Sequence, residues 1–244
     1  MSQIFDQKPY ASGHLRALLT IVLLAAGAAV GLLSMVVNAA LIGTLRSAGD
    51  PGAPYELGES LTEIMYVLIT LLQVAIYIAT AVAFLMWMHR AYRNLPALGA
   101  RNLDTTPGWA VGYFFIPFAN LVKPFQVVRE IWHESAPTGE ARESFGGVSP
   151  RAGTPALVGW WWALWIIANI AGRVSERVDR AGTIESMLIS TWANIVSDGL
   201  FVIAAVLAIL VVKRIDEMQE AKFREIGTQG PPPPPESFET YRTP

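Results

Sequence analysis

The sequence predicts an all-α integral membrane protein with four transmembrane helices and a proline-broken segment that is re-entrant or interfacial. Hydrophobic residues make up 52% of the 244 residues and charged residues 16%, whereas soluble domains average about 25% charged residues. The apolar residues gather in four long runs, and about 20 apolar residues suffice for a helix to cross a membrane. The predicted spans are 17–38, 64–88, 155–172 and 190–212.

Composition also limits the classes of function. The chain has no cysteine, which removes disulfides, thiolate metal sites and cysteine nucleophiles together. The net charge of −2 does not indicate a nucleic-acid partner. We expect one membrane domain, 1–220, followed by a disordered, proline-rich cytoplasmic tail, 221–244.

The first span is charge-free from Ala17 to Val37, which is about 30 Å of helix. It is longer than the apolar core of a cleaved signal peptide. Gly27 and Gly31 form a GxxxG pattern, which allows close approach of helices in membranes. The pattern predicts packing against another helix, and a homo-oligomer through these two glycines is one use of it.

The ends of the second and third spans carry aromatic residues. After the second span, Trp87 and Tyr92 suit the headgroup level, and Arg90 and Arg93 suit the cytoplasmic side. The third span has a cluster of tryptophans near its start, which we interpret as an aromatic belt at the membrane interface. These tryptophans are Trp160, Trp161, Trp162 and Trp165.

The segment 107–133 is apolar but broken. Residues 108–122 would make only about 22 Å of helix, and Pro117 removes a backbone donor within them. Pro124 suits the first turn of a new helix, with Asn120 as its cap. The helix that follows is amphipathic, as is typical of helices that lie in the membrane interface. We predict that the first part dips into the membrane and returns to the same face.

The positive charges favour four spans over five. With four spans and cytoplasmic N- and C-termini, 14 Lys and Arg residues are cytoplasmic and 4 are outside. If the broken segment crossed, 8 would be cytoplasmic and 10 outside. Because cytoplasmic loops carry the excess of Lys and Arg, we predict a multi-pass protein of a bacterial cytoplasmic (plasma) membrane with both termini in the cytoplasm.

Four short motifs in the middle of the chain form a recognisable series: a Trp-Arg-Asn span end, P-G-W, I-P-x-x-N and P-x-Q-x-x-x-E-x-W. The residues that carry them are Trp87, Arg90, Arg93, Asn94, Pro107, Gly108, Trp109, Pro117, Asn120, Pro124, Gln126, Glu130 and Trp132. With these motifs the chain resembles the bacterial membrane family catalogued as domain of unknown function 4328, from the first span to about residue 220. The resemblance implies a multi-pass membrane protein with no assigned activity.

Asp198 is the acidic residue within a predicted span. A crossing of about 20 residues places it roughly 8 Å below the outer edge of the hydrocarbon. Two interpretations stay open: a buried, functional carboxylate, or a carboxylate wetted among the headgroups. The candidate intramembrane polar cluster at this level comprises Asp198, Asn194, Asn169, Asn38 and Arg173, with Arg173 as the expected ion-pair partner.

A basic rim on the cytoplasmic face is the second candidate site. Such a rim would attract anionic headgroups by about 1 kcal/mol per basic residue. The alternative is an ordinary positive-inside flank, paired internally with Glu130 and Glu134. The rim comprises Arg90, Arg93, Arg101, Lys123 and Arg129.

The sequence contains no signature of an enzyme. The histidines His14, His89 and His133 lack metal-ligand spacing, and no HExxH, GxSxG, Walker or GxGxxG motif occurs. We expect no catalytic, cofactor-binding or metal-binding residues and no cofactor. The predicted function is that of a non-enzymatic scaffold or accessory protein, in which the interfacial helix and the basic rim contact the lipid bilayer, its anionic headgroups or an unknown protein partner. The alternative is a small transporter or channel that uses the re-entrant segment and Asp198.

Overall fold

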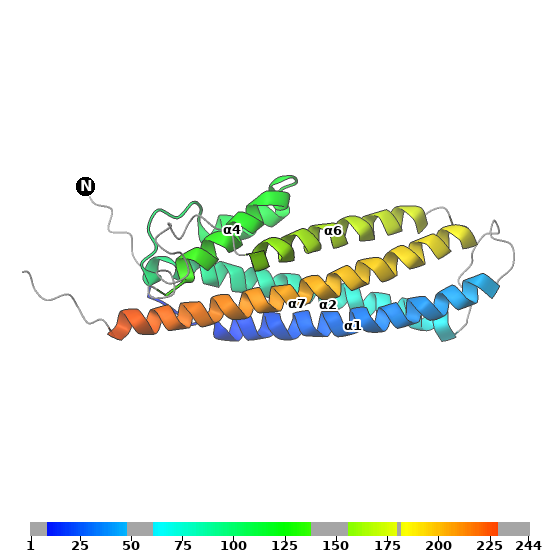
Figure 1. Cartoon of the computed structure of the whole chain (residues 1–244), viewed down its shortest axis with the longest axis horizontal. Helices are drawn as coiled ribbons and strands as arrows, with labels where there is room; N and C mark the ends of the chain where they lie inside the picture. The colour runs from blue at the N-terminus through cyan, green and yellow to red at the C-terminus, as the bar shows by residue number, and fades with distance from the viewer. Residues whose placement is uncertain (1–8, 48–60, 138–155, 180–181, 229–244) are drawn as a thin grey trace, which may run out of the picture.

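The long helices lie side by side, and the shorter helices lie near one end of the bundle (Figure 1). The computed structural model describes residues 9–47, 61–137, 156–179 and 182–228. The long helices are α1 (His14–Ser47), α2 (Leu61–Asn94), α6 (Ala156–Asp179) and α7 (Ile184–Thr228). The shorter elements are η1 (Pro96–Leu98), α3 (Pro107–Gly112), η2 (Tyr113–Phe115) and α4 (Ala119–Ser135).

The start of α1 and the end of α7 lie at the same end of the bundle, on the left of Figure 1. This end is called the terminal end below, and the other is called the opposite end. Helix α7 packs against α1 and α6, and α1 packs against α2. Helix α4 lies over the terminal half of the bundle and does not reach the opposite end. The structure therefore has the four long helices that the sequence predicts, and α6 is the shortest of them.

All four long helices are long and apolar enough to cross a membrane. Helices α1 and α2 have 34 residues each, α6 has 24 and α7 has 45, whereas the hydrocarbon needs about 20. Their polar ends therefore extend beyond the stretch that is long and apolar enough to cross, and in α7 this stretch includes Asp198. Helix α7 also continues to Thr228, into the stretch expected to be a disordered tail. The rest of that tail lies outside the described residues.

Two apolar cores hold the bundle together. The larger lies at the terminal end, and its most deeply buried side chains include Trp87, Tyr92, Val128, Val158 and Ile215. The smaller lies at the opposite end and joins α1 to α7 through Leu41, Leu45, Ile184 and Met187.

The tryptophans of α6 differ from the predicted aromatic belt. Trp160 is exposed, but Trp161 and Trp162 are buried in the larger core. Trp165 stacks on Trp162 with ring centroids 4.7 Å apart. The prediction is wrong for Trp161 and Trp162 because a tryptophan-rich helix start suits a protein core as well as a headgroup layer.

The two glycines of the GxxxG pattern pack within the chain. A Cβ on Gly31 would lie 3.3 Å from Cγ2 of Val202 on α7, and one on Gly27 would lie 3.5 Å from Cγ2 of Ile76 on α2. The close helix approach that the pattern predicts is therefore made with α7 and α2 of the same chain.

The broken segment forms a helical hairpin of α3, η2 and α4. Helix α3 begins with Pro107 after Thr106, whose hydroxyl accepts a hydrogen bond from the Trp109 amide at 3.3 Å. The chain reverses at Pro117 and Phe118, and Phe118 has a φ of 63°. Its ψ is −44° and the Ala119 amide donates to the Pro117 carbonyl at 2.8 Å, which is the pattern of a strained γ-turn. Pro117 therefore marks the break, as predicted.

The second arm starts earlier than the sequence suggests. Helix α4 begins at Ala119, with Phe118 at its N-cap. Asn120 is therefore inside the helix and is not its cap, and Pro124 is the sixth residue, past the first turn. Both expectations are wrong because the tight turn at Phe118 lets the helix resume at once.

The apolar face of α4 packs against protein. Val127, Val128 and Ile131 are buried in the larger core, and Phe125 and Trp132 pack against it. This differs from the predicted interfacial helix, whose apolar face would lie in lipid. An amphipathic pattern indicates that a face is covered, but it does not indicate by what.

The turn of the hairpin carries the exposed apolar surface instead. Phe118 is 86% exposed and Phe115 73%. The turn also lies beside the membrane-spanning part of α6, because the indole Nε1 of Trp162 donates to the carbonyl of Leu121 at 2.9 Å. We propose that this turn dips into the hydrocarbon beside the first turns of α6.

A cysteine placed at Phe118 tests the dip. In membrane vesicles we expect Phe118→Cys to react at least ~10-fold more slowly with a hydrophilic maleimide than Arg129→Cys on the exposed face of α4, because the reactive thiolate does not form in hydrocarbon. The chain has no other cysteine. Both variants should react equally after denaturation. Equal rates in intact vesicles would show that the turn lies in water.

Candidate functional site

A buried amide pair ties the terminal end together. Gln219 of α7 donates from Nε2 to the Ala91 carbonyl at 2.9 Å and to Oγ of Ser135 at 3.0 Å. Its Oε1 accepts from Nδ2 of Asn94 at 3.3 Å. Asn94 also donates to the Ala11 carbonyl at 3.0 Å. One contact point therefore joins α2, α4, α7 and the segment before α1.

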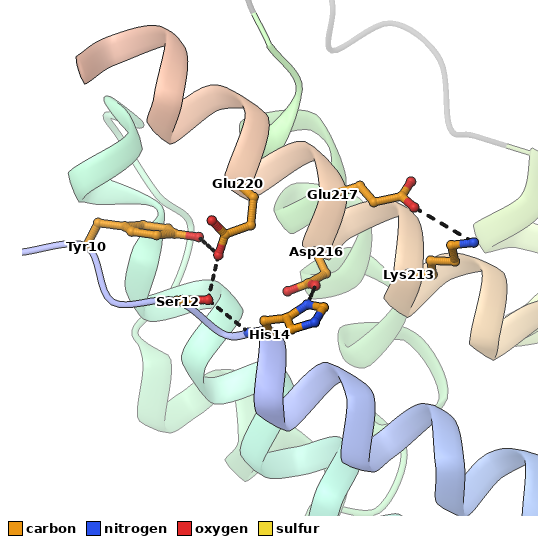
Figure 2. Close-up of polar contacts among 7 residues, drawn as sticks. All are labelled: Tyr10, Ser12, His14, Lys213, Asp216, Glu217 and Glu220. Atoms are coloured by element: carbon orange, nitrogen blue, oxygen red, sulfur yellow. Dashed lines mark hydrogen bonds and ion pairs between the residues drawn. The ribbon is translucent and has the colours of Figure 1, made fainter. Parts of the chain in front are cut away.

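The N-terminal segment is held against α7 by a second set of contacts, shown in Figure 2. Tyr10 and Ser12 donate to the same oxygen of Glu220, at 3.0 and 2.6 Å. Nδ1 of His14 lies 2.7 Å from Oδ2 of Asp216. Tyr10 also stacks on Phe223, with ring centroids 4.2 Å apart. The start of α1 is thereby aligned with the last third of α7.

These contacts raise the pKa of both Tyr10 and His14. Burial and then the hydrogen bond to Glu220 raise the pKa of Tyr10, so its hydroxyl stays a donor at neutral pH. The hydrogen bond and charge of Asp216 raise the pKa of His14. Protonated His14 therefore favours the docked N-terminal segment.

Tyr92 and Glu130 link α2 to α4 and the loop before α3. The Tyr92 hydroxyl donates to Oε2 of Glu130 at 2.8 Å and accepts from the Thr105 amide at 3.1 Å. The other oxygen of Glu130 accepts from the Asp104 amide at 2.8 Å. Burial and then this carboxylate raise the pKa of Tyr92. The pair thus fixes the loop that leads into the hairpin.

Arg16, His89, Arg90 and Arg93 form what is called the basic face below. Nη1 of Arg16 donates to the Met86 carbonyl at 3.2 Å, which brings α1's first turn onto α2. His89, Arg90 and Arg93 follow within two turns of Met86, at spacings that share a helix side. Burial and then the neighbouring positive charges lower the pKa of both His89 and Arg90. In the described part of the chain, no carboxylate forms an ion pair with these arginines.

The rest of the predicted rim is not joined to this face by any contact that the structure shows. Arg101 is exposed in the loop after η1. Lys123 lies over the Tyr113 ring at 5.7 Å, and Arg129 lies over the Phe125 ring at 5.9 Å. Glu130, one of the two expected internal partners of the rim, bonds Tyr92.

Asp198 contacts two helices other than its own. Its Oδ1 accepts from Nε2 of Gln73 on α2 at 3.2 Å, and it also accepts a hydrogen bond from the Ser34 side chain on α1. Asn38 donates to Oγ of Ser34 at 3.1 Å. Asn38 therefore belongs to the polar cluster, as the sequence predicts.

Two other residues of that predicted cluster are directed elsewhere. Asn169 donates back to the Trp165 carbonyl of its own helix at 2.7 Å. Arg173 is exposed and makes no ion pair with Asp198 within the described residues. Asn194 lies one helical turn from Asp198 and is half-buried.

The motif residues quoted from the sequence surround the terminal core. Trp87 and Asn94 are buried, Trp132 packs on the core, and Trp109 is exposed beside Tyr113. Oδ1 of Asn120 is buried without a hydrogen-bond partner in the described part of the chain. Pro107 starts α3, Pro124 is buried in α4, Pro117 is exposed in the turn, and Gln126 is half-buried.

Sequence reasoning did not single out Gln219, Ser34 or Arg16 as site residues. Gln73 could have been singled out, because it is a strongly polar residue within the apolar second span. Gln219 and Arg16 lie in charged flanks, where one polar residue does not stand out. Among the described residues, no group of three or more His, Asp or Glu side chains could hold a metal ion.

The four apolar helices and their buried polar contacts define a helical membrane protein. Residues 56–217 match the family described as Domain of unknown function (DUF4328), and the chain belongs to this family. The match begins after α1, so Ser34, Asn38 and Arg16 lie outside it. No curated protein and no solved structure matches the chain.

Removal of the Tyr92 hydroxyl tests the link between α2 and α4. We expect Tyr92→Phe to lower the free energy of unfolding in detergent by about 1–3 kcal/mol, because Glu130 and the Thr105 amide lose a buried partner. Tyr77→Phe is the matched control, since Tyr77 is exposed on the same helix. Equal stability of the two variants would contradict the assigned role.

Proposed function

We propose that this protein is a non-enzymatic scaffold or accessory protein of a bacterial cytoplasmic membrane, and that its terminal end binds anionic lipid headgroups through the basic face. The observation that carries the proposal is the gathering of Arg16, Arg90 and Arg93 without a paired carboxylate among the described residues. The positive charges of these arginines repel one another, and a bound anion would offset that repulsion and stabilise their gathering.

The level of the basic face in the membrane supports headgroups as the anion. Arg16 directly precedes the charge-free stretch of α1, and Arg90 follows that of α2 by two residues. Both guanidinium groups therefore lie near the phosphate layer when these stretches fill the hydrocarbon. Nε of Arg90 is buried without an acceptor among the described residues.

The packing around Arg90 supports a formed site. A Cβ on Gly13 would lie 3.5 Å from Cγ of Arg90, so the arginine stem packs closely on the start of α1. The N-terminal contacts with Glu220 and Asp216 hold that start in place. The positions of Arg16 and Arg90 are therefore set by contacts made before lipid binds, which lowers the entropy cost of binding.

The hairpin supports the accessory role. Its exposed apolar turn and the basic face lie at the same end of the bundle, so both can contact one leaflet. The turn would anchor α4 at a constant depth, while the solvent-facing side of α4 would be available to a partner. Exposed Arg129 lies on that side.

Lipid titration in nanodiscs tests the proposal. We expect Arg90→Gln/Arg93→Gln to weaken binding of an anionic lipid such as phosphatidylglycerol by about 30-fold, at about 1 kcal/mol per basic residue. Native mass spectrometry or lipid-dependent thermal stabilisation gives the measurement. The effect should shrink as salt rises.

The control is Arg101→Gln/Arg129→Gln, which removes the same charge from exposed positions outside the basic face. This variant should bind the anionic lipid nearly as well as the native protein. If the two double variants lose the same affinity, only net charge matters and the proposed site does not exist.

A further inference from the structure

Three helices bring polar side chains together at one level inside the bundle. Asp198 of α7 accepts from Gln73 of α2 at 3.2 Å and from Ser34 of α1. These contacts lie on the opposite-end side of the larger core, far from the basic face. They are therefore separate from the proposed lipid site.

Residue counts along the three helices agree on the depth of this level. From the terminal-end limit of each charge-free stretch, Ser34, Gln73 and Asp198 lie about 26, 22 and 21 Å away at 1.5 Å per residue. A hydrocarbon layer of about 30 Å then extends about 4–9 Å beyond them. The carboxylate lies inside the layer, near its far edge.

The carboxylate has no positive partner at this level among the described residues. Both of its partners are neutral, and Arg173 is exposed and makes no ion pair with it. An isolated carboxylate in a medium of low dielectric is strongly disfavoured, and hydrogen bonds offset only part of that cost. A single positive charge bound at the carboxylate would offset this free-energy cost.

Asn38 independently indicates a ligand. Its side chain is only 2% exposed, and its Nδ2 donates to both the carbonyl and Oγ of Ser34, at 3.0 and 3.1 Å. Its Oδ1 is buried and has no partner among the described residues. Buried polar atoms are nearly always paired, so this oxygen beside Ser34 indicates an absent positive or hydrogen-bearing group.

The oxygen atoms available at this level suit a monovalent cation as their ligand. Besides the carboxylate, the cluster offers the neutral oxygens of Ser34, Gln73 and Asn38. Calcium sites collect six to eight oxygens, several of them from carboxylates, whereas one carboxylate balances one charge. Polar residues also continue from Asp198 toward the opposite end of the bundle on one side of α7. Ser186, Ser190 and Asn194 precede Asp198 at intervals of four residues, which places them on the same face of the helix.

We infer that Asp198, with Ser34, Gln73 and Asn38, forms a binding site for one monovalent cation, a proton or a sodium ion, that enters from the opposite end of the bundle. This inference goes beyond lipid binding. It also supplies the site that the transporter or channel alternative requires.

Carbodiimide labelling tests the site in the native protein. Dicyclohexylcarbodiimide partitions into the membrane and adds to a protonated carboxyl group, and peptide mass spectrometry locates the adduct. We expect Asp198 to be labelled, with a yield that falls about tenfold per pH unit once the carboxyl ionises. Asp216 and Glu220, at the water-exposed end, serve as internal controls.

Added salt separates the two ions. If sodium binds, sodium chloride should suppress labelling of Asp198 more than choline chloride of the same concentration does, and Asn38→Leu should weaken this protection. If only a proton binds, labelling should follow pH and ignore sodium. Both results support the site.

Two results would overturn the inference. One is the absence of label at Asp198 between about pH 5 and pH 9, the range in which a buried carboxyl titrates. The other is a label that responds to neither pH nor sodium. Because both are measured on the native chain, they do not depend on whether Asp198→Asn folds.

Discussion

The terminal end of this protein depends on one buried amide pair, Gln219 and Asn94. Their side chains are 3% and 2% exposed, and together they contact α2, α4, α7 and the segment before α1. Each of these hydrogen bonds satisfies a group that would otherwise be buried unpaired, which costs roughly 1–3 kcal/mol. The pair therefore fixes the register of α7 against α2 and the attachment of α4.

The proposed lipid site follows from that register. Asn94 holds Ala11, the contacts of Tyr10, Ser12 and His14 continue the attachment along α7, and α1 then starts with Arg16 against α2. Arg90 and Arg93 lie on the same turns of α2 as the Ala91 carbonyl that Gln219 binds. The basic face is thus a consequence of how the helices are joined, and it cannot be recognised from either helix alone.

The architecture could be predicted from the sequence because a charge-free run of about 20 residues has a single common use. The break at Pro117 could also be predicted, because proline disrupts a helix by a local mechanism. Whether protein or lipid covers each apolar face could not be predicted. Trp161, Trp162 and the apolar face of α4 contact protein, while Phe115 and Phe118 are exposed, and hydropathy is the same in both cases.

Among polar residues, the sequence located single positions but not their partners. Asp198 and Asn38 were placed at one level by counting residues, and the structure brings both to Ser34. Arg173 was expected at that level too, yet its side chain is exposed and forms no ion pair with Asp198 among the described residues. Pairing depends on the rotation of each helix about its axis, which side-chain packing sets and a residue count does not supply.

The side of the membrane that each proposed site faces depends on the orientation of the bundle. Single cysteines at Thr228 and Glu185, exposed at the two ends of α7, report it directly in whole cells with a membrane-impermeant maleimide. We expect Glu185→Cys to react in intact cells and Thr228→Cys to react only after permeabilisation, because the excess of Lys and Arg lies at the terminal end. The reverse pattern would place the basic face outside the cell, where the proposed binding to cytoplasmic headgroups could not occur.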